Sequence, residues 1–318
     1  MHHFYLPPDQ CRGDSLVLTG SEAHHARHAV RLRRGERVTV VDGAGQAFLC
    51  EVREYDGDQV RLAVFERQSQ PPPPAQLTLL QAVPKGKLME VIVQKATELG
   101  ASRIVPVLTE RVVVHLDDDA AARKAEKWGL VALEAMKQCG SAWLPIVETP
   151  VTPARFLARK ENFELSLVAS LEPGSRPARD YFHAFHTRCG RLPQSVCVWV
   201  GPEGDFTPAE TEAIKLHGTL PITLGRLILR CETAAIYCLS VLNYELQSFT
   251  APAPALGTTA QSVLDGPESE TGACAPQSIR QIDPCPARHG QQSRSGIAPA
   301  SETSRFLARS LPQPLEPQ

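Results

Sequence analysis

The sequence predicts two folded domains, a small β-barrel over residues 1–70 and an α/β domain with a parallel sheet over residues 77–248. Three observations support this fold class. Short β-rich runs fill the first part, strands and helices alternate in the second, and four consecutive prolines separate the two in the segment QSQPPPPAQ. Because a polyproline run is stiff and cannot join a helix or a sheet interior, we expect residues 71–76 to form an interdomain linker.

The composition is that of a globular protein without a strong overall charge. The chain has 318 residues, of which 42% are hydrophobic and 21% charged, and its formal net charge is −2. Any nucleic-acid-binding surface therefore has to be a local patch. No stretch reaches the roughly 18 uninterrupted apolar residues of a membrane span. The chain starts without a signal-peptide pattern, and its nine cysteines include no C-x-x-C pair, so we expect a cytoplasmic protein with reduced thiols and no zinc site.

The barrel is predicted from four β-rich runs that are punctuated by Asp-Gly turns. These runs cover residues 15–20, 36–43, 47–57 and 58–66. One helix is expected over residues 21–33, with Ser21 as its N-cap. A small barrel interrupted by one helix is the expected shape.

The predicted helix of the barrel and its C-terminal end carry a cluster of basic residues. Its members are His24, His25, Arg27, His28, Arg31, Arg33 and Arg34. The cluster is either an ordinary solvated helix face or a patch that contacts phosphates. His24 and His28 are spaced four residues apart, but no third ligand is evident, so we expect no metal there.

The α/β domain is predicted from alternating strand and helix patterns. Strands are expected over residues 77–83, 103–108, 163–170, 195–200 and 221–225, and helices over residues 87–100, 117–140, 207–218 and 232–247. Thr207 and Glu210 have the spacing of a capping box, and Gly140 is expected to end the second helix. The buried face of the first helix is expected to carry Leu88, Val91, Ile92, Ala96 and Leu99. Such alternation is typical of a parallel sheet covered on both faces.

Residues 249–318 have a different composition, rich in Pro, Ser, Ala, Gly and Gln. Their apolar residues lack a period of 2 or 3.6, so we expect a disordered tail. The segment SRFLARSL near the end could form a short transient helix.

Two glycine-bearing loops follow predicted strands of the α/β domain. One contains Gly201-Pro202-Glu203-Gly204 and the other contains Gly225. Ligands of open parallel sheets bind beyond the carboxyl ends of the strands, and glycine lets the backbone approach a ligand closely. The first loop alone is either a tight turn or a ligand-binding loop, but two such loops would lie side by side above one sheet. Neither loop has the dinucleotide or P-loop pattern.

The second loop runs into GRLILRCETAA, which places Arg230 and Glu232 between an apolar run and a predicted helix. These charges could form an intramolecular ion pair at a strand-to-helix turn. The alternative is a loop shaped to hold a ligand.

The paired loops GPEGDFTPAE and LGRLILRCETAA resemble the cofactor loops of the SPOUT class of RNA methyltransferases. The segments PKGKLMEVIVQKATELGASRIVPVLTERVVV and EAMKQCGSAWLP are similar to the ribosomal RNA small-subunit methyltransferase E family, which methylates N3 of a uridine in 16S ribosomal RNA. The segment EAHHARHAVRLRRGERVTVVDGAG resembles the PUA-like barrel of that family. The resemblance covers nearly all of residues 1–248 and none of the tail.

This resemblance implies a fold and a ligand that the sequence patterns do not reveal. The fold would be a SPOUT-type parallel sheet with a C-terminal trefoil knot, an exception to the rule that chains avoid knots, preceded by the PUA-like RNA-binding barrel. The cofactor would be S-adenosylmethionine, and the partners would be 16S ribosomal RNA within the small ribosomal subunit and a second copy of the chain. The implied cofactor-binding residues are Leu171, Gly201, Glu203, Gly204, Leu224, Gly225, Ile228 and Leu229.

The resemblance also implies roles for charged residues. Arg230 would stabilise the anion that develops on uracil, and Glu232 would orient Arg230 or accept the N3 proton. A structural ion pair remains the alternative for these two residues. The implied RNA-binding residues are Arg27, Arg31, Arg33, Arg34 and Lys85. Methyl transfer from a sulfonium has a neutral leaving group, so no metal is required.

Two departures from the family pattern stand out. The family usually has a glycine-like residue directly after GPEG, and this chain has Asp205 there. The family usually has arginines after QCG, and this chain has Ser141-Ala142-Trp143 there. Trp143 could stack on a base instead, or it could be a buried or interface residue. The sequence therefore predicts a ribosomal RNA methyltransferase. The alternatives are a SPOUT enzyme for another RNA nucleotide and a non-catalytic RNA-binding assembly factor.

Overall fold

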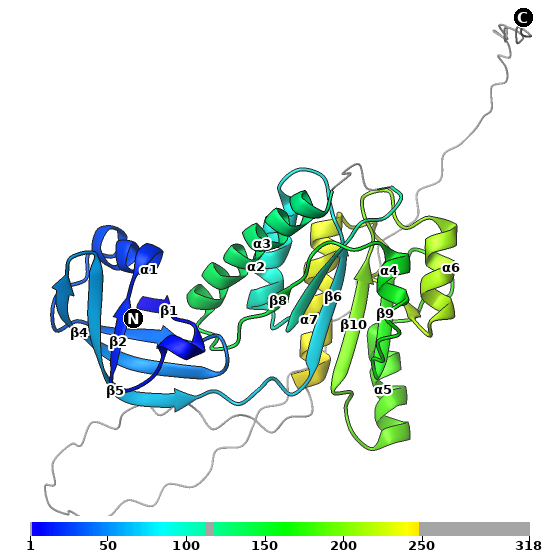
Figure 1. The fold of residues 1–318 in the computed structure, drawn as a ribbon. Coiled ribbons are helices and arrows are strands. Elements are labelled where there is room, and N and C mark those ends of the chain that lie inside the picture. Colours follow the sequence, from blue (N-terminus) through cyan, green and yellow to red (C-terminus); the bar gives the residue numbers. More distant parts are fainter. Residues whose placement is uncertain (1, 112–116, 248–318) are drawn as a thin grey trace, which may run out of the picture. The chain divides into compact units, whose positions relative to one another are not determined.

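The computed structural model describes residues 2–111 and 117–247. Two sheets organise this part of the chain (Figure 1). The tail predicted over residues 249–318 lies outside the described residues. In the described ranges no helix is long and apolar enough to cross a membrane.

The N-terminal sheet has five strands in the order β1-β3-β4-β5-β2. Their bounds are His2–Tyr5 (β1), Ser15–Leu18 (β2), Arg37–Val41 (β3), Gln46–Asp56 (β4) and Gln59–Ser69 (β5). The four predicted runs correspond to β2–β5, which pair in antiparallel fashion, whereas β1 was not predicted and pairs parallel to β3. A short 3-10 helix, η1 (Pro8–Gln10), follows β1. The alternating inward side chains form one apolar cluster that includes Phe4, Leu18 and Val38.

The helix of this barrel is shorter and less regular than predicted. Helix α1 spans Gly20–His24 and continues as a π-helix, η2 (His25–Ala29). The N-cap is Thr19, in an extended conformation and without a side-chain cap bond, so the prediction of Ser21 as N-cap was wrong. The helix does not reach residue 33, because Arg31 adopts a left-handed backbone with φ of 57°.

The second sheet has six parallel strands in the order β11-β9-β10-β6-β7-β8. The bounds are Gln76–Ala82 (β6), Arg103–Val107 (β7), Ile146–Val147 (β8), Leu165–Ala169 (β9), Ser195–Val200 (β10) and Leu220–Ile222 (β11). The helices are Leu88–Glu98 (α2), Asp118–Cys139 (α3), Pro153–Leu157 (α4), Ala178–Cys189 (α5), Pro208–Leu216 (α6) and Cys231–Gln247 (α7). The sequence did not predict β8, α4 or α5.

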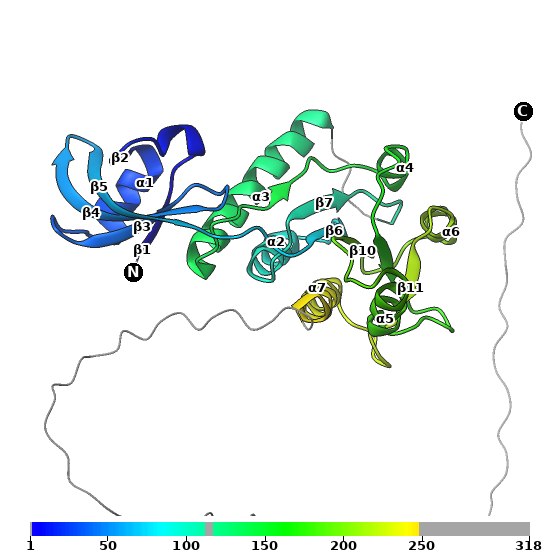
Figure 2. The same ribbon diagram turned by 90° about the horizontal axis from the view of Figure 1, so that it is seen from below.

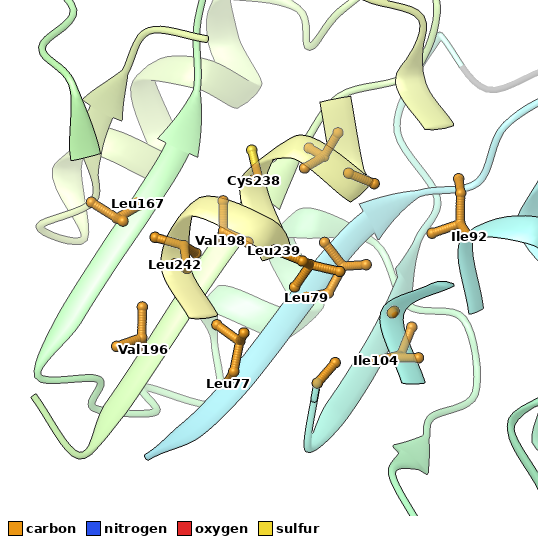
Figure 3. Packing of buried hydrophobic residues seen from close by; sticks show 14 of the residues in the cluster. Leu77, Leu79, Ile92, Ile104, Leu167, Val196, Val198, Cys238, Leu239 and Leu242 are labelled. Carbon is orange, nitrogen blue, oxygen red and sulfur yellow. The ribbon is translucent and has the colours of Figure 1, made fainter. Parts of the chain in front are cut away.

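Apolar clusters cover both faces of the parallel sheet, as predicted. Residues of α2, α3, α5 and α7 pack on one face, where Leu79, Val198 and Leu239 are buried (Figure 3). Residues of α4 and α6 pack on the other face around Trp199. Figure 2 shows α2 and α7 on one side of β6 and β10, and α4 on the other. Strands buried on both faces explain why these segments are continuous apolar runs.

The helix boundaries follow local chemistry that the sequence reveals. The capping box of Thr207 and Glu210 is formed, and Gly140 ends α3 in a left-handed conformation. The predicted face of α2 was partly wrong, because Val91 is 42% exposed and Met89 and Val93 are buried instead. Helix α2 is therefore rotated about its axis relative to the orientation that the predicted buried face implied.

Strand β5 ends at Ser69 and β6 begins at Gln76, so residues 70–75 connect the two sheets. The division of the chain into domains at residues 70 and 76 stays a prediction. The trefoil knot also stays a prediction, since strand order and register do not establish threading.

Candidate cofactor-binding site

A cavity of about 290 Å³ opens where the predicted loops follow β9, β10 and β11. It lies at the carboxyl edge of the parallel sheet, where ligands of such sheets bind. Of the predicted cofactor-binding residues, seven line this cavity: Leu171, Gly201, Glu203, Leu224, Gly225, Ile228 and Leu229. Arg230 lines it too, whereas Gly204 and Glu232 are not among its lining residues.

The first loop is closely folded around Gly201. A Cβ added at Gly201 would lie 2.7 Å from Oδ1 of Asp205 and 3.3 Å from its Cα, so a larger residue would require Asp205 to shift. Asp205 itself has a left-handed backbone with φ of 61°. Its Oδ1 accepts a hydrogen bond from the Phe206 amide at 2.8 Å. Glycine would adopt this backbone without strain, whereas here the Asp205 carboxylate supplies a local hydrogen bond that helps to hold it.

Two neighbouring segments hold the same loop. The Lys85 amide donates to Oε1 of Glu203 at 3.1 Å, so Glu203 links this loop to the one after β6. The Arg111 guanidinium donates to the carbonyl oxygens of Gly204 and Phe206. Gly204 thus contributes a backbone acceptor to the loop.

The second loop combines an open glycine with exposed apolar side chains. Gly225 has φ of +106°, and an added Cβ there would meet no heavy atom within 4 Å. Leu227 and Ile228 are 76% and 83% exposed, and Leu171 on the facing loop is 62% exposed. Large apolar side chains gathered around one cavity mark a binding surface.

Arg230 and Glu232 do not form the ion pair that the sequence left as an alternative. In the parts of the chain that the structure describes, the salt bridges include none between these two residues. Arg230 is exposed at the cavity. A Glu232 carboxylate oxygen lies 3.5 Å from the Cys231 thiol, which donates to it.

Cys231 is a buried thiol whose pKa is affected by Glu203 and Glu232. Its burial raises the pKa of the thiol to about 12, and the negative charge of Glu203 and the hydrogen bond to Glu232 act in the same direction. The thiol is therefore protonated at neutral pH, and it serves as a hydrogen-bond donor instead of a nucleophile.

The predicted RNA-binding arginines divide into two groups. Arg27 is held within the barrel, where its Nη1 donates to the Gly57 carbonyl at 2.5 Å and to Asp58 at 3.1 Å, and its guanidinium lies 5.8 Å from the Tyr55 ring centroid. The others, Arg31, Arg33 and Arg34, are exposed near the end of η2, and Lys85 is exposed in the loop after β6.

Trp143 is an interface residue. Of the two roles that the sequence left open, stacking on a base or packing at an interface, the structure shows the second. Its indole Nε1 donates to the Pro71 carbonyl at 3.1 Å. An added Cβ at Gly45 would lie 2.5 Å from the indole ring, and Ala44 forms a β-bridge with Trp143. Trp143 therefore connects the parallel-sheet domain to the barrel and to residues 70–75.

A larger cavity of about 490 Å³ lies near the beginning of β9 and β11. Its walls include Phe156, Trp199 and Thr219, and none of the predicted site residues lines it. We assign the ligand to the smaller cavity, because only that one is built from both glycine loops. Among the residues that the structure describes, no group of three or more His, Cys, Asp or Glu side chains could hold a metal.

Comparison with known proteins decides the family. A model of the RNA methyltransferase domain matches residues 71–243, and a model of the RNA methyltransferase PUA domain matches residues 18–65. The ribosomal RNA small subunit methyltransferase E of Bacillus subtilis is 33% identical over 236 residues, which are 73% of this chain and 91% of that protein. The chain belongs to this methyltransferase E family. The enzyme of the same name from Synechocystis is 30% identical over 78% of each chain.

Solved structures agree with membership of the methyltransferase E family. A putative methyltransferase from Legionella pneumophila, in complex with S-adenosylmethionine, has a TM-score of 0.68 and 32% identity, covering 77% of this chain and 96% of that one. Methyltransferase E from Neisseria gonorrhoeae, bound to S-adenosylmethionine, has a TM-score of 0.69 and 26% identity, covering 77% and 97%. The expectations of an RNA methyltransferase and of a PUA-type barrel are therefore confirmed.

Sequence reasoning missed Arg111, Asp205 and Cys231 as parts of this site. Cys231 and Asp205 lie inside the motifs that carried the resemblance, so their position was visible but their environment was not. Arg111 contacts a residue 93 positions away in the sequence, and no local pattern indicates such a contact.

Proposed function

We propose that this chain transfers a methyl group from S-adenosylmethionine to N3 of a uridine in 16S ribosomal RNA within the small ribosomal subunit. The observation that carries the proposal is the cavity formed by two glycine loops at the carboxyl edge of the sheet in a methyltransferase E chain. It fits such a cofactor, since its walls are largely apolar and the space beside Gly225 is free of protein atoms.

The cofactor, when bound, supplies a methyl group on a positively charged sulfur. The chain's own part is to hold that group, to exclude water and to manage the proton on uracil N3. Leu171, Leu227 and Ile228 are apolar and exposed around the cavity, so they are suited to cover a ligand and to remove water from its surroundings. Fixing two reactants in line supplies a large part of the rate.

Arg230 and Glu232 are proposed to act on the uracil. The N3 proton must leave as the N–C bond forms, which puts negative charge on the ring and its oxygens. The exposed Arg230 guanidinium at the cavity can stabilise that charge. The Glu232 carboxylate, which already accepts from the Cys231 thiol, can take up the proton or orient Arg230.

The RNA is proposed to contact the exposed basic residues of the barrel. Arg31, Arg33, Arg34 and Lys85 are available for phosphates, whereas Arg27 acts mainly within the barrel. Contacts of this kind make affinity depend on salt concentration.

The active form is proposed to be a cytoplasmic homodimer. Leu227 and Ile228 remain largely exposed in the single chain, and a second copy could cover what the cofactor does not. The seven cysteines that the structure describes are free thiols, which suits a reducing compartment.

The test is to map modifications of 16S ribosomal RNA in a strain that lacks this gene. We expect one 3-methyluridine to disappear and to return with the wild-type chain but not with Gly225→Val, whose side chain would occupy the open space. Gly218→Val is the control, since Gly218 also has a positive φ and open surroundings but lies away from the cavity. An unchanged modification map would contradict the proposal, and loss of a different methyl group would assign another target nucleotide.

A further inference from the structure

We propose that Arg111 is a positioning residue that holds the 201–207 loop in its ligand-binding shape by clamping the peptide groups on both sides of Asp205. The inference rests on the proposed function only in taking S-adenosylmethionine as the ligand of the cavity. Arg111 lies outside both glycine motifs and follows β7, so it acts on the cavity from outside.

Asp205 is the strained point of this loop. Its φ of 61° places a non-glycine residue in the left-handed region. A side chain in that region is strained, and such a conformation persists only when the surroundings hold it. The Asp205 carboxylate supplies one such restraint by accepting from the Phe206 amide at 2.8 Å.

Arg111 supplies the other restraint from outside the loop. Its Nη1 donates to the Gly204 carbonyl, directly before Asp205, and to the Phe206 carbonyl, directly after it, at 3.4 Å. A change of the Asp205 backbone to a right-handed conformation would reorient these neighbouring peptide groups. Such a change would therefore break the hydrogen bond from the Arg111 guanidinium to the Gly204 carbonyl and the weaker, longer one to the Phe206 carbonyl.

Arg111 is itself kept in place by its neighbour. The Glu110 amide donates to Oε1 of Glu210 at 2.9 Å, and Oε2 of Glu210 accepts from the Thr207 amide at 2.9 Å. Glu210 is only 9% exposed. The segment after β7 is thus tied to the start of α6, and Arg111 has a defined position from which to reach the loop.

The position of Asp205 reaches the cavity through Gly201. Oδ1 of Asp205 lies over Gly201, at 2.7 Å from the site of an added Cβ, and both residues line the cavity. Glu203 between them is tethered by the Lys85 amide. If Asp205 relaxed, the wall formed by Gly201 and Glu203 would shift. We therefore expect Arg111 to affect ligand affinity without touching the ligand.

The test compares Arg111→Met and Asp205→Gly singly and together, with Arg155→Met as the control at another exposed arginine. Calorimetry with S-adenosylmethionine should show an affinity about tenfold lower for Arg111→Met and unchanged for Arg155→Met. Glycine adopts positive φ without strain, so adding Arg111→Met to Asp205→Gly should lower affinity by about twofold or less. Arg111→Lys should recover part of the loss.

Equal affinity of Arg111→Met and wild type would overturn the inference, and so would a loss that is as large in the Asp205→Gly background as in wild type. If the wild-type chain itself failed to bind S-adenosylmethionine, the proposed function would fall. The inference would then be decided by amide hydrogen exchange of the free protein. Faster exchange at residues 204–207 in Arg111→Met, but not in Arg155→Met, supports the clamp, and equal exchange overturns it.

Discussion

The Lys137 ammonium of α3 lies 2.7 Å from Oε1 of Glu22 in α1, with the two side chains 5% and 12% exposed. The other oxygen of Glu22 accepts from the Tyr5 amide at 3.0 Å, and the exposed Glu134 is the second anionic partner of Lys137. One buried ion pair therefore connects the helix of the barrel, its first strand and the longest helix of the parallel-sheet domain.

Lys137→Met should destabilise the protein strongly, because it leaves the Glu22 carboxylate buried without its cation. Removing one partner of a buried pair costs about 3–5 kcal/mol. Glu134→Gln is the matched control, and since Glu134 is 61% exposed its loss should cost about 0–1 kcal/mol. Urea unfolding measures both, and equal midpoints for the two variants would show that the pair carries little energy.

The stability of the protein at acid pH should depend on Glu164. The hydrogen bond from Arg191, followed by that from the Gln194 amide, lowers the pKa of Glu164 from 4.5 to about 2. A lowered folded-state pKa contributes stability above the unfolded value, and this contribution is lost as the pH falls from about 4.5 towards about 2. Glu164→Gln should therefore flatten the pH dependence of the melting temperature in that window. If the melting temperature of Glu164→Gln depended on pH as that of the wild type does, Glu164 would not contribute to stability at acid pH.

Gly45→Ala tests the contact between Trp143 and the barrel. Gly45 and Gly174 have similar positive φ, +97° and +90°, but an added Cβ meets the Trp143 ring at 2.5 Å in the first case and nothing within 4 Å in the second. Both substitutions therefore carry comparable backbone strain, so their difference reports the steric clash. Gly45→Ala should be less stable than Gly174→Ala by about 1–3 kcal/mol in chemical denaturation. Equal stabilities would mean that Trp143 moves aside freely.

The sequence predicted the parallel sheet and its two functional loops because both produce local patterns. Continuous apolar runs that alternate with amphipathic segments indicate buried parallel strands, and glycines at the strand ends mark the loops. Helix α5 was missed although Ala178, Phe182 and Phe185 have helical spacing and are buried. Strand β1 is four residues long and pairs with residues 38–41, so its strand character comes from a remote partner.

The remaining site features depend on contacts between distant segments. Seven of the eight cofactor-binding residues that the family resemblance implied line the cavity. The resemblance could not indicate that Arg111 reaches the Gly204 carbonyl, or that Arg230 and Glu232 stay apart. The left-handed backbone at Asp205 likewise results from restraints outside its own segment.

Arg230→Met distinguishes a catalytic Arg230 from a structural one. Loss of a group that stabilises developing negative charge should lower single-turnover methylation about 10²-fold at saturating cofactor. The melting temperature should change little, because Arg230 is exposed and has no ion pair with Glu232 among the described residues. Arg226→Met, at an exposed arginine of the same loop that does not line the cavity, is the control. A near-normal rate for Arg230→Met would make Arg230 a scaffold residue.

The central claim is tested most directly by nucleoside analysis of a reaction with purified components. Small ribosomal subunits from a strain lacking this gene are incubated with the purified chain and S-adenosylmethionine carrying a labelled methyl group. The 16S RNA is then digested to nucleosides, which are separated by chromatography beside 3-methyluridine and 5-methyluridine standards, because these two isomers have the same mass. We predict that the label elutes with 3-methyluridine, and that large subunits incubated in a parallel reaction acquire no label. Label in another nucleoside, or no transfer by a chain that binds the cofactor, would contradict the account.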